Sequence, residues 1–297
     1  KSERSSTILS IRERIRWDVE RLIKIDRKLD ANGLIYTADD VIDEFYRYSM
    51  EYSLFNYMES IIAKLKQNGN IRTSETYRAT LNSFKKFRKD EDIMLDCITS
   101  EVMENFEAWH KSRGVAPNSI SFYTRILRAV YNRAVENDII ENRNPFRHVY
   151  TGVDKTVKRA LSLSVIKKIK TLELSLTPAL DFARDMFMMS FYLRGMSFID
   201  MAFLRKTDLK NGYITYRRRK TGQQLIIEWT KEMQMILDKY TENKSDYLLP
   251  VIRNPDINER CTYRNIGYNI NHNLKKIAKM IGVTIPLTLY VARHSWA

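Results

Sequence analysis

The sequence predicts a mainly α-helical protein of two domains joined by a linker, with one small antiparallel β-sheet. Its 297 residues exceed one typical domain, so two compact cores are expected. Nine glycines and six prolines are few for this length, and long stretches rich in Lys, Arg, Glu, Leu, Ile and Met favour helix. One stretch, YITYRRRKTGQQLIIEW (213–229), has instead the pattern of a β-hairpin.

The first 36 residues predict one amphipathic helix from about Thr7 to Leu29, ending before Asn32-Gly33. Its apolar positions follow helical spacing: Ile8, Ile11, Ile15, Val19, Leu22 and Ile25. Because the chain opens without an initiating Met, we expect sequence before Lys1 to be missing. The helix is then the remnant of a larger N-terminal segment.

Residues 37–148 predict a helical domain. Thr37 has the position of an N-cap, with an acidic first turn at Asp39 and Asp40. The expected helices run from Thr37 to Gln67, from Thr73 or Ser74, from Thr99 or Ser100 to Trp109, and from Pro117.

Two of these helices carry a polar stripe opposite an apolar one. The stripes are Arg78, Asn82, Lys85 and Lys89 in the first helix, and Ser121, Arg125, Arg128 and Asn132 in the second. A pair of such faces suits a clamp that follows the phosphates of a duplex. The alternative is a pair of ordinary solvated faces.

Helical periodicity is lost after Asn144-Pro145-Phe146, and we place a linker at residues 149–160. The second domain, 161–297, is expected to hold a helix at 164–174, a long apolar helical region at 178–204, the hairpin, and two helices at Lys231–Tyr240 and Tyr263–Met280. The sequence then closes on PLTLYVARHSWA.

The charge balance favours a polyanionic partner. The chain has 50 Lys and Arg against 36 Asp and Glu, a formal net charge of +14. Nucleic acid is the partner most typical of this excess, whereas the alternative is a charge that serves only solubility. The distant Cys97 and Cys261 and the four histidines show no metal-ligand spacing, which predicts a reduced, cytoplasmic, metal-free protein. No apolar run is long enough to span a bilayer, and the first residues, KSERSSTILS, lack the apolar core of a signal peptide, so we expect neither secretion nor a membrane location.

Arg194 stands out because its neighbours, from Met186 to Leu204, are mostly apolar. A guanidinium in such surroundings is desolvated unless an anion or a carboxylate meets it. Taken alone, this residue favours a structural ion pair with Asp200, and the alternative is anion binding.

The hairpin gathers cationic side chains at its turn: Arg217, Arg218, Arg219 and Lys220, followed by Thr221-Gly222. A lysine on a tight turn can reach a phosphate or give a proton to a leaving oxygen. Taken alone, the hairpin favours a second interpretation, a strand edge protected by charge.

The last helix expected brings Tyr290, Arg293 and His294 within one turn, so a phenol, a guanidinium and an imidazole can converge. The guanidinium fork matches phosphate oxygens in a way that an ammonium does not. The alternative is a polar helix start with aromatic packing.

Taken in order, these features resemble the tyrosine recombinase, or phage-type integrase, family from about Thr37 to Ala297. The most specific pieces are Lys220-Thr221-Gly222 and ARHSWA (292–297), and RGMSFIDM and YVARHSWA resemble integrases of Bacteroides-type mobile elements. The resemblance implies a helical core-DNA-binding domain at 37–148, an α+β catalytic domain at 161–297, and an arm-binding domain of which residues 1–36 are a remnant.

The sequence departs from the family's motifs at two positions. The family usually has Gly-x-Arg-x-x-Glu with Leu four residues later, and aligning Asp200 and Leu204 places Ser197 in the Arg position. We expect Arg194, nearly one helical turn away, to serve instead. In the family's His-x-x-Arg motif, Tyr290 takes the His position and Arg293 the Arg position. The family's nucleophilic tyrosine follows a few dozen residues later, so we expect it beyond Ala297 and the chain as given to bind DNA without cleaving it.

The resemblance implies a site-specific recombinase that cleaves and rejoins DNA through a 3′-phosphotyrosyl intermediate without a cofactor. Arg194 and Arg293 would bind the phosphate oxygens, Lys220 would protonate the leaving 5′-oxygen, and Tyr290 would steady the phosphate. Further DNA contacts would come from the two helical stripes and from Arg217, Arg218, Arg219 and Thr221. The implied partners are double-stranded DNA, a synaptic tetramer of the full-length protein, and an accessory DNA-bending factor.

The sequence is compatible with one function besides recombination and disfavours another. A DNA-binding architectural or regulatory protein on the same scaffold stays open as an alternative. A hydrolytic nuclease is disfavoured, because the sequence shows no clustered carboxylates of the kind that hold Mg²⁺.

Overall fold

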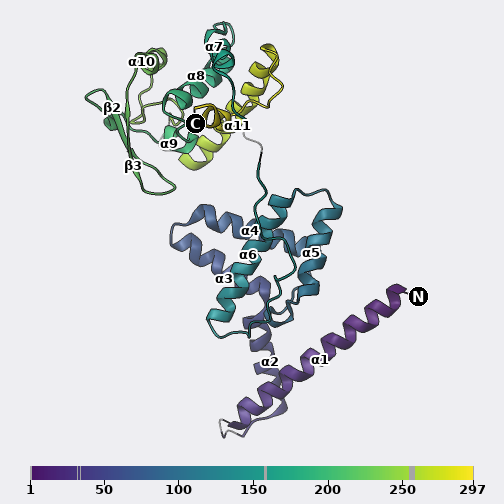
Figure 1. Cartoon of the computed structure of the whole chain (residues 1–297). Coiled ribbons are helices and arrows are strands. Elements are labelled where there is room, and N and C mark those ends of the chain that lie inside the picture. Colours follow the sequence, from purple (N-terminus) through teal and green to yellow (C-terminus); the bar gives the residue numbers. More distant parts are fainter. Residues whose placement is uncertain (1, 32, 34, 157–158, 254–257, 297) are drawn as a thin grey trace. The chain divides into compact units, whose positions relative to one another are not determined.

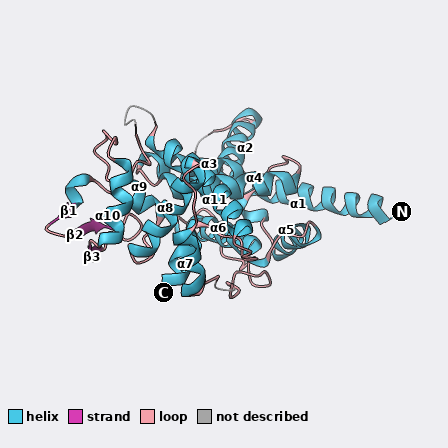
Figure 2. Ribbon diagram, turned by 90° about the horizontal axis from the view of Figure 1, so that it is seen from above, coloured by secondary structure: helices cyan, strands magenta, loops and turns pink. Residues whose placement is uncertain are grey.

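The computed structural model describes residues 2–31, 33, 35–156, 159–253 and 258–296. Asn32 of the predicted helix stop, residues 157 and 158 of the predicted linker, and Ala297 of the last motif lie outside the described residues. The chain forms two compact units, Lys1–Lys155 and Thr156–Ala297, and their boundary lies within the stretch expected as linker. Helices dominate beside one three-stranded antiparallel sheet (Figures 1 and 2), which confirms the predicted fold class.

Helix α1 (Ser2–Ala31) includes the predicted amphipathic helix. Its C-terminal part is anchored: Ile25 is buried, and the buried guanidinium of Arg21 donates to Asp18 at 2.8 Å and to Asp96 at 3.0 Å. The apolar residues nearer the N-terminus are exposed instead of buried: Ile8, Ile11, Ile15, Val19 and Leu22.

Helix α2 (Ala38–Tyr52) begins at the predicted cap. The backbone N–H of Asp40 donates to the hydroxyl of Thr37, and the N–H of Thr37 donates to the Asp40 carboxylate at 2.8 Å, so both members of a capping box are present. The single helix expected to run on to Gln67 is wrong. Ser53 ends α2 and caps α3 (Leu54–Gln67), where its hydroxyl accepts the N–H of Asn56 at 3.0 Å.

The remaining helices of the first unit are α4 (Ile71–Arg88), α5 (Ser100–Ser112) and α6 (Pro117–Glu136), with a short 3₁₀ turn at Leu95–Cys97. Thr99 caps α5 and Pro117 opens α6 as predicted, whereas α4 begins two residues before Thr73. The core is rich in large apolar side chains: Leu54, Met58, Ile62, Leu81, Phe84, Phe106, Val130 and Tyr131. Each of α3 to α6 contributes to it.

The second unit is built around α8 (Pro178–Tyr192), which packs against α11 (Glu259–Met280) and α12 (Leu289–Trp296). Its other helices are α7 (Leu163–Thr171), α9 (Phe198–Ala202) and α10 (Lys231–Leu237). The continuous helical region expected at 178–204 is wrong, because a turn at residues 193–197 separates α8 from α9. Gly195 lies in that turn with a φ of +71°, a conformation that ends a helix.

The sheet has the order β1–β2–β3, with β1 at Leu209–Lys210, β2 at Tyr213–Arg217 and β3 at Gln224–Glu228. β2 and β3 form the predicted hairpin in the register Tyr213↔Glu228 to Arg217↔Gln224. Ile214 and Ile227 point into the core, so the opposite face of the hairpin is exposed. Within the described ranges, no helix combines the length and hydrophobicity that crossing a membrane requires.

Candidate functional site

Helix α12 presents the residues of the second motif. Leu289, Val291 and Ala292 are buried in the core of the second unit, which fixes the rotation of the helix. On the other side of the helix, Tyr290 is exposed, and Arg293 and His294 are half-buried. The predicted grouping of phenol, guanidinium and imidazole on one helical face is therefore present.

Arg293 is held against the turn between α8 and α9. Its Nε–H donates to the carbonyl oxygen of Gly195 at 2.6 Å. A Cβ on Gly195 would lie 2.9 Å from the Cα of Arg293, so glycine allows this close approach. Because Nε is used, the two terminal nitrogens of the guanidinium remain to receive an anion.

Arg194 lies in the same turn, immediately before Gly195, with a φ of +55°. Its side chain is exposed, so the prediction that its charge is desolvated among apolar neighbours is wrong. The expectation that Arg194 and Ser197 share a helical face is also wrong, since residues 193–197 form a turn. The turn nevertheless brings Arg194 next to the residue that holds Arg293.

Asp200 joins the first motif to the hairpin. Its buried carboxylate accepts the hydroxyl of Ser197 at 2.5 Å and the backbone N–H of Arg219 at 2.9 Å. No ion pair links Arg194 to Asp200 in the part of the chain that the structure describes, so the structural ion-pair interpretation of Arg194 is wrong. Asp200 instead fixes the backbone directly before Lys220.

Lys220 lies in the hairpin turn and is exposed. On either side of it, the guanidinium of Arg217 donates to the carbonyl oxygen of Gly222 at 3.2 Å, and that of Arg219 lies 4.1 Å from the ring centroid of Phe203. These contacts hold the turn, and among the described residues no hydrogen bond or ion pair engages the ammonium of Lys220. A solvent-facing lysine on an ordered turn meets the geometric requirement of the sequence prediction.

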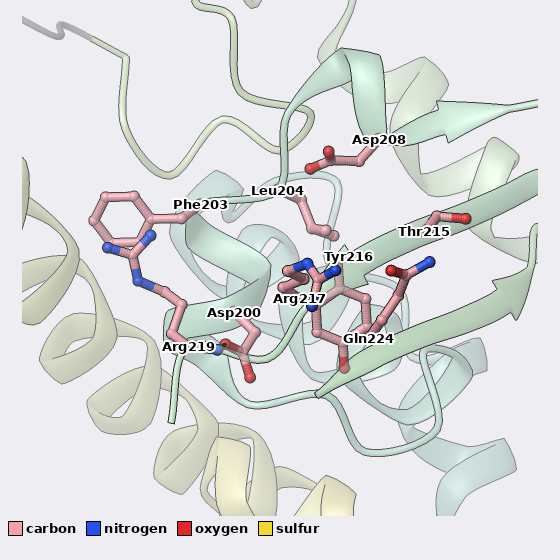
Figure 3. A pocket seen from close by; sticks show the side chains of 9 residues that line it. All are labelled: Asp200, Phe203, Leu204, Asp208, Thr215, Tyr216, Arg217, Arg219 and Gln224. Carbon is pink, nitrogen blue, oxygen red and sulfur yellow. Dashed lines mark hydrogen bonds between the residues drawn. The ribbon is translucent and has the colours of Figure 1, made fainter. Parts of the chain in front are cut away.

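A cavity of about 390 Å³ lies beside the hairpin, lined by Asp200, Phe203, Leu204, Asp208, Thr215, Tyr216, Arg217, Arg219 and Gln224. Figure 3 shows the guanidinium of Arg219 against the Phe203 ring, with Asp200 beside the backbone of Arg219. Two guanidinium groups and two carboxylates line the cavity, so its charges are balanced.

Tyr216 is a residue that the sequence did not single out. Burial raises the pKa of its phenol, the charge of Asp200 raises it further, and Arg218 and Arg293 act in the opposite direction. Tyr216 therefore lies within electrostatic reach of the first motif, the hairpin and α12. Side chains alternate between the two faces of β2, so Tyr216 points inward like Ile214, two residues earlier. This alternation was the signal in the sequence that could have identified it.

The two helical stripes of the first unit differ from their prediction. Ser121 is buried and its hydroxyl donates to the carbonyl oxygen of Gly152, so its assignment to an outward DNA-binding face is wrong. Arg78 pairs with Glu59 through both terminal nitrogens. The exposed members of the stripes are Asn82, Lys89, Arg125, Arg128 and Asn132, while Lys85 is half-buried with its ammonium 5.0 Å from the Phe55 ring centroid.

Within the described part of the chain, no cluster of three or more His, Cys, Asp or Glu has the arrangement of a metal site. Arginine, lysine, tyrosine and histidine make up the site instead. Such groups bind and orient phosphate oxygens and move protons.

Comparison with known proteins gives three likenesses. Residues 53–151, which begin at the cap of α3 and include α4 to α6, match the family model of the phage integrase SAM-like domain. The tyrosine recombinase XerD of Listeria monocytogenes is 25% identical over 243 residues, which are 76% of this chain and 77% of that protein.

The third likeness is to solved structures. A lambda integrase dimer bound to a COC' core site has a TM-score of 0.61 at 16% identity, over 82% of this chain and 88% of that one. A lambda integrase tetramer bound to a Holliday junction has a TM-score of 0.57 at 17% identity, over 74% of this chain and 64% of that one. The Tn1549 transposon integrase in complex with circular intermediate DNA has a TM-score of 0.55 at 13% identity, over 82% of this chain and 85% of that one. These structures share the fold of this chain.

Proposed function

We propose, from the placement of this chain in the tyrosine recombinase/integrase family, that it recombines DNA at specific sites through a covalent phosphotyrosyl intermediate. The observation that carries the proposal is the hydrogen bond from Arg293 to Gly195, which brings one guanidinium against the turn that holds another. Asp200 links that turn to the hairpin with Lys220. Three cationic residues thus come from elements that these hydrogen bonds join.

The proposed reaction forms a bond between a tyrosine oxygen and the scissile phosphorus while the bond to the 5′-oxygen breaks. Arg194 and Arg293 stabilise the charge that develops on the non-bridging oxygens. Lys220 gives its proton to the leaving 5′-oxygen, and Tyr290 donates a hydrogen bond to the phosphate. The nucleophile is proposed to follow Arg293 in the sequence of the full-length protein, as in the family.

The proposed substrate is double-stranded DNA. The exposed cations of α4 and α6 contact the phosphates from the first unit, and Arg217, Arg218 and Arg219 with Thr221 contact them from the second. The lambda integrase structures hold DNA as a dimer and as a tetramer, and we propose a synaptic tetramer here. This reaction occurs in the cytoplasm on nucleoid DNA, and an accessory DNA-bending factor is a further proposed partner.

The test is covalent trapping of the full-length protein on a nicked duplex. After cleavage, the short strand that would religate diffuses away, so the protein–DNA adduct accumulates. Wild-type protein is expected to form a protein–DNA adduct, which denaturing electrophoresis detects. Arg194→Ala and Lys220→Ala are each expected to slow the adduct by about 10²-fold or more, since each removes charge stabilisation or proton transfer.

Ser197→Ala is the matched comparison for Arg194→Ala. If Ser197→Ala abolished the adduct and Arg194→Ala did not, the assignment of Arg194 to the phosphate would be overturned. Retained DNA binding with no adduct in any variant or in the wild type would instead favour the non-catalytic DNA-binding protein.

A further inference from the structure

The outward face of α12 holds an imidazole that the proposed reaction has not yet used. His294 lies one residue after Arg293 and one helical turn after Tyr290. Since Leu289, Val291 and Ala292 anchor the opposite face in the core, these three side chains emerge together. One of the three, Arg293, contacts the turn at Gly195, so the group emerges next to that turn.

The ring of His294 is oriented by a neighbouring ring, while its nitrogens are not engaged by the described residues. It meets the ring of Tyr290 edge to face, with centroids 4.7 Å apart and an interplanar angle of 88°. Neither ring nitrogen has a hydrogen-bond or ion-pair partner among the residues that the structure describes, whereas the buried His110 contacts Ser83 at 3.0 Å. His294 is half-buried, so a ligand over α12 can reach it.

The proposed attack requires a proton acceptor. A tyrosine hydroxyl has an ordinary pKa of about 10, so at neutral pH its proton must pass to a base as the new bond forms. A guanidinium or an ammonium has no lone pair with which to accept it. The carboxylate of Asp200 already accepts from Ser197 and Arg219. A neutral imidazole has both the free lone pair and the suitable proton affinity.

We propose that His294 is the general base of strand cleavage, an inference that rests on the proposed function. The imidazole takes the phenolic proton of the attacking tyrosine as the oxygen–phosphorus bond forms. The 5′-oxygen leaves with the proton of Lys220. In religation the 5′-hydroxyl returns its proton to Lys220, and the imidazolium gives its proton back to the departing tyrosine. Tyr290 positions the ring through the edge-to-face contact and keeps its own hydroxyl for the phosphate.

The experiment measures the rate of adduct formation by the full-length protein on the nicked duplex, at saturating DNA and across pH. His294→Ala is expected to slow the adduct by about 10²-fold or more and to remove the imidazole-dependent limb of the pH profile. Added imidazole is expected to restore the rate of His294→Ala by about tenfold or more, because a diffusing base replaces the lost one. His272→Ala, which removes an exposed histidine of α11, is the control and is expected to change the rate by less than about twofold.

A second arm relocates the base. Tyr290→His in the His294→Ala background places an imidazole one turn earlier on the same helix face, and recovery of about tenfold or more supports a chemical role. A merely structural role would respond neither to imidazole nor to this relocation. The inference is overturned if His294→Ala forms the adduct at a rate within about threefold of wild type. It is also overturned if neither added imidazole nor Tyr290→His restores the rate of His294→Ala, and in both cases the recombinase proposal stands. A wild-type protein that forms no adduct overturns both.

Discussion

Arg293 donates from Nε to the carbonyl oxygen of Gly195 at 2.6 Å, across 98 positions of sequence. The contact sets the guanidinium of α12 beside the turn that carries Arg194. It depends on a residue without a side chain, since a Cβ at position 195 would lie 2.9 Å from the Arg293 Cα.

Gly195→Ala is therefore expected to displace α12 and to strain a backbone with a φ of +71°. The strain and the overpacking each cost about 1–3 kcal/mol, and the adduct rate falls further because the guanidinium moves. Chemical denaturation and adduct trapping measure the two effects. Gly282→Ala is the control, because its φ is +70° but nothing lies within 4 Å of the added Cβ. Equal losses in both variants would show that the Arg293 contact plays no part.

The site also shows which features the sequence can predict. The hairpin and the exposed position of Lys220 follow from local turn chemistry, and Thr37 with Asp40 determines a helix start within four residues. The environment of Arg194 was mispredicted because the apolar periodicity continues across Gly195, where the chain turns.

Tertiary contacts explain the remaining differences. The break between α2 and α3 at Ser53 is reinforced by a hydrogen bond from the serine hydroxyl to Asp92, 39 residues later. Ser121 has the helical offset of an exposed stripe, yet it is buried and its hydroxyl donates a hydrogen bond to the carbonyl oxygen of Gly152, 31 residues later. Spacing within one helix contains no information about which distant segment packs on it. The polar identity of a residue is then a poor guide to its exposure.

Asp185 is expected to be the most costly carboxylate to remove from the second unit. It is 3% exposed and accepts from Arg184 at 3.1 Å, from Lys239 at 2.9 Å and from the Tyr240 hydroxyl at 2.9 Å. Asp185→Ala removes the acceptor of the Tyr240 hydroxyl and leaves Arg184 and Lys239 with Asp181 as their remaining carboxylate, so it should lower the free energy of unfolding by about 1–3 kcal/mol. Denaturant titration measures the loss. Asp246→Ala, at an exposed position, should stay within about 0.5 kcal/mol of wild type, and a similar loss there would contradict the assignment.

His110 is expected to make the first unit less stable as the pH falls. Burial lowers the pKa of its imidazole and the charge of Arg113 lowers it further. Below about pH 6.5 the unfolded chain binds a proton that the folded protein resists, so the free energy of unfolding decreases from there down to the lowered pKa. Denaturant titrations at about pH 7.5 and pH 5.5 measure the change. His110→Gln should remove much of the pH dependence, whereas His148→Gln, at an exposed position, should retain it.

Arg125 and Arg128 on α6 are expected to contribute to DNA affinity in a salt-dependent way. Both side chains are exposed; Arg125 donates to the carbonyl oxygen of Ser121 at 3.3 Å, and Arg128 donates to the hydroxyl of Thr151 at 3.1 Å. Each change to alanine should weaken binding and reduce the slope of log K against log salt by about 1, since one fewer phosphate is neutralised. Fluorescence anisotropy with a duplex measures both quantities.

Arg78 supplies the contrast within the same unit. Its guanidinium is already neutralised by Glu59, so Arg78→Ala should change the salt slope by less than either α6 variant. Glu59→Gln frees that guanidinium and should strengthen binding. If instead Arg78→Ala flattened the slope while Arg125→Ala left it unchanged, the DNA would follow α4, and the ion pair with Glu59 would have to open on binding.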